Sequence, residues 1–169
     1  SKLHNKKMKK ITSLIVLFIL LAFINACTGY KPIFSSSNLQ FEITDHLIEG
    51  DKKLGNQIYS KLYNLSKSNK NQEGIKSIYL TINVLKEKKP TSKDTTGKIL
   101  EYKVNLNTKV VIKNYLTNKK ILNKNFIFSS SYKVQDQYSE TVKLENKLVE
   151  NLINQTYQEL IIKLTENIL

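Results

Sequence analysis

Apolar and polar residues alternate with a period of two in four segments of the chain: 39–44, 78–84, 100–113 and 121–134. This period is typical of strands that bury one face and expose the other. Between the third and fourth segments lies the turn-prone stretch 117–119, where asparagine tolerates the backbone angles of a tight turn. The pattern therefore predicts four strands, the last two of them paired antiparallel.

Two further segments carry apolar residues at helical spacing. The first follows Asp51, a good helix start, and its apolar positions are Leu54, Ile58, Leu62 and Leu65. The second is predicted over 139–167, with Ser139 as its cap and apolar residues recurring at steps of three, four and seven. Each pattern predicts an amphipathic helix with one buried side.

The predicted order is strand, helix, three strands, helix. Because only two helices are available to cover a sheet with one dry face, both should lie on that face. The fold class is therefore α+β, a two-layer sandwich of a largely antiparallel four-stranded sheet and two helices. Segment 86–98, with Pro90 and Gly97, is predicted to be a charged loop. Lys124 and Ser130 interrupt the apolar side of the fourth strand.

The N-terminal block has the organisation of a lipoprotein signal. Lysines around Met8 precede the apolar run 11–23, and Cys27 ends the block. An uncleaved membrane anchor is the alternative, but this run is shorter than the about 20 apolar residues that crossing requires. We expect a signal peptide over 1–26, a lipidated tether over 27–38 and a single domain over 39–169. The start residue is either Met8 or an upstream residue.

Cys27 is the one cysteine of the chain. An exported chain with a lone thiol has no internal disulfide, and the position at the end of a signal favours acylation. Two or three acyl chains give stable membrane anchoring, whereas one binds only marginally.

The charge of the chain comes from lysine alone. Its 27 basic residues are all lysines, and the net charge is +13. Removing the signal takes away five of them and leaves 22 cations against 14 anions, a charge of +8. Without arginine, which makes bidentate contacts to phosphates and bases, a nucleic-acid partner is disfavoured. The positive charge suits anionic lipid headgroups or phosphorylated glycolipid instead.

No catalytic constellation stands out after the signal. His46 is alone, and a lone histidine does not form a zinc site, so a surface or strand-end role is expected. Nucleophile elbows, phosphate loops and dinucleotide fingerprints are missing from the sequence. We therefore expect no enzyme activity, no metal and no cofactor. Tyr79 and Tyr115 lie on predicted wet faces, where a protein partner can use them as anchors.

The chain resembles the lipopolysaccharide-assembly lipoprotein family, LptE. The likeness rests on the stretch Ala26-Cys27-Thr28-Gly29-Tyr30-Lys31-Pro32-Ile33, on Phe128-Ser129-Ser130-Ser131-Tyr132 before the final helix, and on the order of the elements. The resemblance implies a protein lipid-anchored on the periplasmic side of the Gram-negative outer membrane. It also implies a role as the plug of an LptD-type β-barrel that assists lipopolysaccharide assembly. Thr28, rather than aspartate, after the cysteine agrees with sorting to the outer membrane.

Candidate lipopolysaccharide contacts are Lys103, Lys109 and Lys113, which project from one wet strand face. The family's proposed contacts are basic side chains on the sheet, but no motif ties them to particular lysines. The alternative function is a periplasm-facing lipoprotein that binds a small ligand or a cell-wall polymer without a barrel partner. A truncated chain that starts after Cys27, stays monomeric and binds cell-wall fragments would favour this alternative.

Overall fold

The computed structural model describes residues 39–68 and 74–168, all within a unit that spans Ser36–Leu169. The predicted signal, the tether and Cys27 lie outside the described residues. The elements are β1 Phe41–Gly50, α2 Lys52–Ser68, β2 Lys76–Lys93, β3 Ile99–Asn114, β4 Lys120–Lys133 and α3 Tyr138–Ile168. Neither of these helices is long and apolar enough to cross a membrane.

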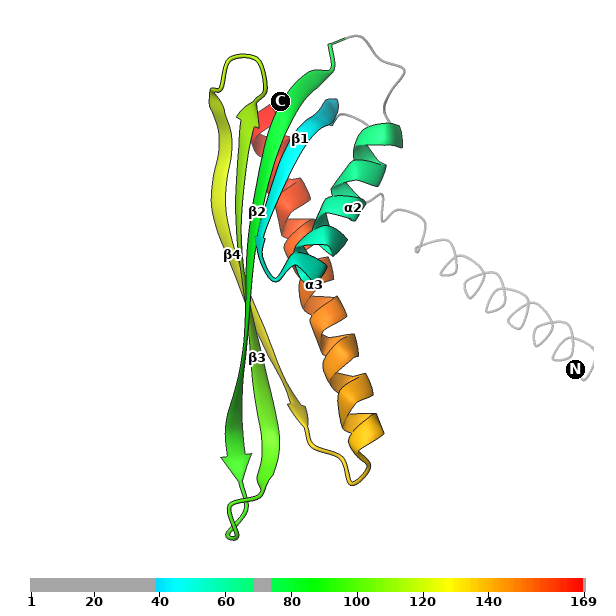
Figure 1. Ribbon diagram of the computed structural model, residues 1–169, viewed down its shortest axis with the longest axis vertical. Coiled ribbons are helices and arrows are strands. Elements are labelled where there is room, and N and C mark those ends of the chain that lie inside the picture. Colours follow the sequence, from blue (N-terminus) through cyan, green and yellow to red (C-terminus); the bar gives the residue numbers. More distant parts are fainter. Residues whose placement is uncertain (1–38, 69–73, 169) are drawn as a thin grey trace, which may run out of the picture. The chain divides into compact units, whose positions relative to one another are not determined.

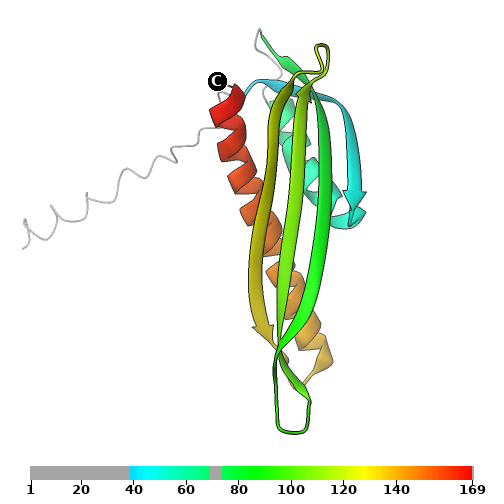
Figure 2. The ribbon, with the colours of Figure 1, turned by 90° about the vertical axis from the view of Figure 1, so that its left-hand side faces the viewer.

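The four strands form one mixed sheet in the order β1-β2-β3-β4. β1 runs parallel to β2, because α2 connects them, and the other neighbours are antiparallel. Both helices cover the same face of the sheet, α2 over β1 and α3 over β4 and β3 (Figures 1 and 2). The structure confirms the predicted α+β sandwich. The face that neither helix covers is termed the outer face.

The core lies between the helices and the inner face of the sheet. Alternate residues of the two central strands are at most 1% exposed: Ile78, Leu80, Ile82, Val84, Val104, Leu106, Val110 and Ile112. Burying each such side chain stabilises the fold by roughly 1.5–3 kcal/mol. Ile58 and Leu62 of α2 and Ile153 and Leu160 of α3 complete the core from the other layer. The predicted apolar faces of these elements are confirmed.

β1 is longer than the alternation predicted, since it continues past residue 44 to Gly50. A register shift between Ile43 and Asp45 changes the phase of its side chains. His46 therefore pairs with Leu80 on the inner side, where its ring stacks on Tyr59 at 3.9 Å between centroids. His46 is exposed, as expected, and its contact is a ring contact with α2.

The prediction of a charged loop over 86–98 is wrong. β2 continues to Lys93, and only five residues, 94–98, connect it to β3. Beyond Val84 no β1 residue pairs with β2, so this part of β2 is a sheet edge that tolerates Pro90. Asp94 closes the turn by accepting hydrogen bonds from the backbone N–H groups of Thr96 and Lys98 at 2.8 and 2.9 Å.

α2 starts as predicted. The Asp51 carboxylate accepts a hydrogen bond from the backbone N–H of Leu54 at 3.1 Å, which satisfies a free donor of the first turn. Gly55 then allows close packing on the sheet, because a Cβ at this position would lie 2.4 Å from Cγ2 of Ile48. The start of α2 is thus determined both by its cap and by its contact with β1.

Ser139 is not the cap of the final helix, because α3 already begins at Tyr138. The Gln137 carbonyl accepts the first backbone hydrogen bonds, from Glu140 at 3.2 Å and Thr141 at 3.3 Å. The Thr141 hydroxyl, one turn into the helix, accepts a hydrogen bond from the backbone N–H of Gln135 at 2.8 Å. The segment that connects β4 to α3 is therefore held in place by Thr141, a residue of α3.

The polar residues that interrupt the apolar side of β4 are explained by its place at the sheet edge. Lys124 and Ser130 lie opposite Val110 and Val104 of β3 but are exposed. A charged side chain on the inner side of an edge strand discourages pairing with other chains. Leu100 was also expected on the dry face, yet it is 43% exposed near the start of β3.

Candidate functional site

The three candidate lysines all lie on the outer face of β3. Lys103 and Lys109 are exposed, and Lys113 is half-buried. The strand spaces them six and four residues apart, or about 20 and 14 Å at roughly 3.4 Å per residue. The structure therefore brings them onto one face but not into one site. One phosphate group cannot contact all three.

The sheet register gives each lysine different neighbours. The cross-strand partners are Lys89 and Ser131 for Lys103, Asn83 and Asn125 for Lys109, and Tyr79 and Lys120 for Lys113. Lys89 forms an ion pair with Glu87, with its Nζ 3.0 Å from the carboxylate oxygen. Among residues 39–68 and 74–168, Lys113 and Lys120 have no acidic partner within 4.0 Å. The same holds for Lys103 and Lys109, so no ion pair within the described part of the chain offsets the lysine charge of the outer face of β3.

The centre of the outer face is rich in uncharged amides. Five asparagines lie there on three adjacent strands: Asn83, Asn105, Asn107, Asn123 and Asn125. Leu85 and Ile127 flank Asn107 on either side and are 54% and 66% exposed. Amides both donate and accept hydrogen bonds, so this surface suits a polar partner without requiring a partner of one charge.

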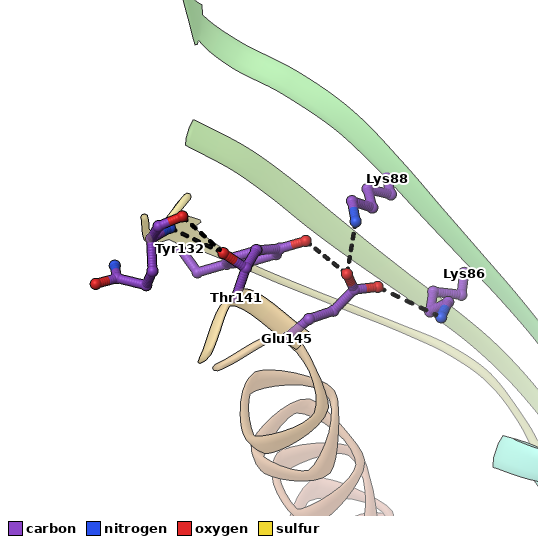
Figure 3. A network of polar contacts seen from close by, with 6 residues as sticks. Lys86, Lys88, Tyr132, Thr141 and Glu145 are labelled. Atoms are coloured by element: carbon purple, nitrogen blue, oxygen red, sulfur yellow. Dashed lines mark hydrogen bonds and ion pairs between the residues drawn. The ribbon is translucent and has the colours of Figure 1, made fainter. Parts of the chain in front are cut away.

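A polar network joins the inner face of the sheet to α3, in the half of the sheet that leads to the β2–β3 hairpin (Figure 3). The Glu145 carboxylate accepts hydrogen bonds from Lys88 Nζ and from the Tyr132 hydroxyl, both at 2.6 Å. Lys86 Nζ lies 3.9 Å from the other carboxylate oxygen. The Lys88 ammonium also lies over the Tyr102 ring, 4.3 Å from its centroid. The network ties three strands to the first turns of α3.

The charges of this network stabilise one another. Burial would raise the pKa of Glu145, but hydrogen bonds from Lys88 and Tyr132 and the nearby ammonium charges hold that pKa below its usual value. Burial would lower the pKa of Lys88, yet its contacts with Glu145 and Tyr132 raise that pKa well above its ordinary range. Burial and the carboxylate raise the pKa of Tyr132. At neutral pH Glu145 and Lys88 form an ion pair, and the Glu145 carboxylate also accepts a hydrogen bond from the neutral Tyr132 hydroxyl.

We expect Glu145→Gln to lower the free energy of unfolding at neutral pH by about 1–2 kcal/mol, because it removes a partly buried charged acceptor. The folded pKa of Glu145 is depressed, so its contribution is present above the unfolded pKa and lost as pH falls through the folded pKa. Urea unfolding at several pH values measures this. The two stability curves should converge in acid. Glu140→Gln, an exposed change on the same helix, should have little effect at any pH.

The sequence interpretation missed this network because it assigned Lys86 and Lys88 to a loop. Their spacing of two continues the inner-face positions of Ile82 and Val84. Two lysines at such positions obscure the apolar period, and only a partner on another element identifies them as inner-face residues. That partner, Glu145, is 57 residues away from Lys88 in sequence.

A groove of about 670 Å³ lies between α2 and α3. Its lining is mixed, with cations Lys53, Lys61 and Lys86 and anions Asp51 and Glu150. In the part of the chain that the structure describes, no three metal-ligating side chains come together. The mixed charges of its lining suit a small polar ligand.

Comparison with known proteins gives likenesses in structure. No family model matches the chain, and no curated protein sequence matches it. A candidate lipoprotein from Caulobacter crescentus superposes with a TM-score of 0.52 at 12% identity, over 76% of this chain and 88% of that one. Lipoprotein B from Nitrosomonas europaea gives 0.52 at 13% identity, over 79% and 88%.

A minor lipoprotein from Acinetobacter baumannii is similar to the same degree. Its TM-score is 0.51 at 16% identity, over 75% of this chain and 94% of that one. These likenesses extend over most of each protein, so they concern the whole domain rather than one motif. The chain therefore has the fold of these bacterial lipoprotein structures.

Proposed function

We propose that this protein is a lipoprotein of the outer membrane, anchored through Cys27 on the periplasmic side, that binds an LptD-type β-barrel and assists lipopolysaccharide assembly. The observation that carries the proposal is a fold shared with lipoprotein structures, together with a long polar sheet face of this chain that neither α2 nor α3 covers. The resemblance of the signal region to the LptE family supports it independently.

The length of the tether limits how far the domain lies from the proposed anchor at Cys27. Leu39, the first described residue, precedes β1 at the end of the sheet that also holds the β3–β4 turn (Figure 1). The β2–β3 hairpin forms the opposite end. The tether over 27–38 reaches at most about 40 Å at roughly 3.5 Å per residue. The anchor therefore keeps the first end of the sheet within reach of the membrane.

The chemistry of the outer face fits a polar lumen. Barrel interiors are polar, and the asparagine-rich centre of the outer face offers donors and acceptors to such a wall. Lys103, Lys109 and Lys113 add positive charge that attracts phosphorylated glycolipid. A plug acts by contact and needs no catalytic group.

Affinity purification from detergent-solubilised outer membrane tests the barrel partner. We expect a large β-barrel protein to co-purify at a fixed ratio, and recovery of the chain alone would contradict the proposal. Depletion of the protein should then lower folded barrel and surface lipopolysaccharide together. A loss of neither would also contradict it.

The combined change Lys103→Gln, Lys109→Gln and Lys113→Gln is expected to weaken lipopolysaccharide binding on the order of 100-fold at low salt, since each lysine near an anionic surface contributes about 1 kcal/mol. Binding of labelled lipopolysaccharide to the purified protein measures the effect. The matched control removes three exposed helix lysines that lie outside the α2–α3 groove, Lys52, Lys67 and Lys147. Equal losses in both variants would assign the effect to net charge rather than to the outer face.

The α2–α3 groove favours one second candidate function, binding of a small ligand or a cell-wall polymer without a barrel. Its volume of about 670 Å³ falls within the range of small-molecule sites. Binding of cell-wall fragments to the purified chain, lost in Lys61→Glu and retained in Lys109→Glu, would favour this candidate. Barrel co-purification would favour the first one.

A further inference from the structure

The β3–β4 turn exposes two large apolar side chains. Leu116 is 83% exposed and Tyr115 is 48% exposed. The turn is nevertheless well ordered by hydrogen bonds, because Asn114 Oδ1 accepts from the backbone N–H groups of Leu116 and Thr117 at 3.0 and 2.8 Å. Asn118 adopts the positive φ of 56° that closes the turn. The fold thus holds Leu116 in water, where its exposure costs free energy unless a partner covers it.

Several lysines lie close to this apolar tip. Residues 113–120 include Lys113, Lys119 and Lys120 and no acid. Lys119 and Lys120 also line a depression of about 250 Å³ next to the turn, together with Lys76 of β2. An apolar tip with lysines close to it matches a bilayer interface, where acyl chains meet anionic headgroups.

The position of the turn in the fold supports the same partner. Phe41 of β1 pairs with Lys76, and the backbone N–H of Tyr115 donates to the carbonyl of Ser77 at 2.9 Å. The entry of the chain at Leu39 and the β3–β4 turn are therefore at one end of the sheet, as Figures 1 and 2 both show. The segment that precedes Leu39 contains the apolar run 11–23 and Cys27. The membrane-directed part of the chain is thus attached at the end that carries the apolar tip.

We propose that the β3–β4 turn docks on an anionic phospholipid bilayer, with Leu116 and Tyr115 in the interface and Lys113, Lys119 and Lys120 against the headgroups. Tyrosine is favoured at this depth because its ring is apolar and its hydroxyl remains hydrated. Leu85 and Ile127, two exposed apolar residues at the centre of the outer face, lie among asparagines instead. Docking would orient the anchored domain and needs no barrel partner.

Single-tryptophan variants test the proposal directly, because the chain contains no tryptophan. Leu116→Trp and the control Ile127→Trp are made in the full acylated chain and reconstituted in vesicles of phosphatidylcholine and phosphatidylglycerol. We expect a blue-shifted emission and quenching by brominated phospholipid for Leu116→Trp alone. An unquenched Leu116→Trp overturns the proposal. Equal quenching of both variants also overturns it, because the contact would then not be specific to the turn.

The role of the lysines is tested in the same Leu116→Trp background. Lys119→Gln with Lys120→Gln should lower the equilibrium constant for insertion of the turn about 25-fold at low salt, measured from the quenched fraction. Lys143→Gln with Lys147→Gln, on exposed positions of α3, is the matched control and should leave it unchanged. Quenching that is equal in vesicles of pure phosphatidylcholine overturns docking through anionic headgroups. No barrel is present, so these results are independent of the proposed barrel partner.

Discussion

Replacing Gly50 with alanine is expected to lower the free energy of unfolding by about 3–4 kcal/mol. Gly50 has a φ of 71°, in the left-handed region that costs alanine about 1–2 kcal/mol. A Cβ would also lie 2.1 Å from the carbonyl oxygen of Val84, which accepts the backbone hydrogen bond of Asp51 at 2.8 Å. Because the clash is with backbone, β1, β2 or the start of α2 has to move. Urea unfolding at neutral pH measures the loss.

Gly97→Ala is the matched control for this prediction. Gly97 has a φ of 88°, but a Cβ there meets no atom within 4 Å. It should therefore cost only the backbone strain of about 1–2 kcal/mol. If both variants lose the same stability, the close contact with Val84 contributes nothing and the explanation is wrong.

If the protein is anchored as proposed, replacing Cys27 with serine is expected to abolish acylation and to remove the protein from the membrane in which the acyl chains hold it. In the proposed function the Cys27 thiol accepts the acyl-bearing group, and serine has no thiol to offer. Anchoring by two or three chains would be lost completely, since a single chain already binds membranes only marginally. Intact mass spectrometry and membrane fractionation measure the change. The wild-type chain should begin at Cys27 and carry added acyl mass, whereas Cys27→Ser should retain its leader.

The neighbouring change Thr28→Ser is the control for the cysteine substitution, because it leaves the thiol and the small residue before it intact. It should retain acylation and membrane location. A wild-type chain with a free thiol still joined to residues 1–26 would contradict the lipoprotein assignment. The β3–β4 turn would then have to be tested without its anchor.

Periodicity predicted most of the fold because burial in a two-layer domain repeats along each element. Ile78 to Val84 and Leu54 to Leu62 are buried at the predicted positions. The same method failed over 86–98, where lysines occupy inner-face positions of a strand that extends beyond β1. Periodicity also missed the register shift after Ile43, since a bulge changes the phase without a change in composition.

The candidate site was predictable only in part. The sequence placed Lys103, Lys109 and Lys113 on one strand face, and the structure confirms that shared face. Their role in lipopolysaccharide contact stays a prediction. Cross-strand neighbours such as Lys120 could not be inferred, because they depend on the register between strands.

Local chemistry along the chain was enough to predict the order of the elements, the dry face of the sheet, the Asp51 cap and the Asn118 turn, since each depends on residues close in sequence. Tertiary structure alone decided the contacts between distant segments. It brought Glu145 to Lys88 and Tyr132, and it placed the β3–β4 turn at the end where the chain enters the sheet. Such contacts depend on strand order and helix placement, which are determined by packing the whole core rather than by any one segment.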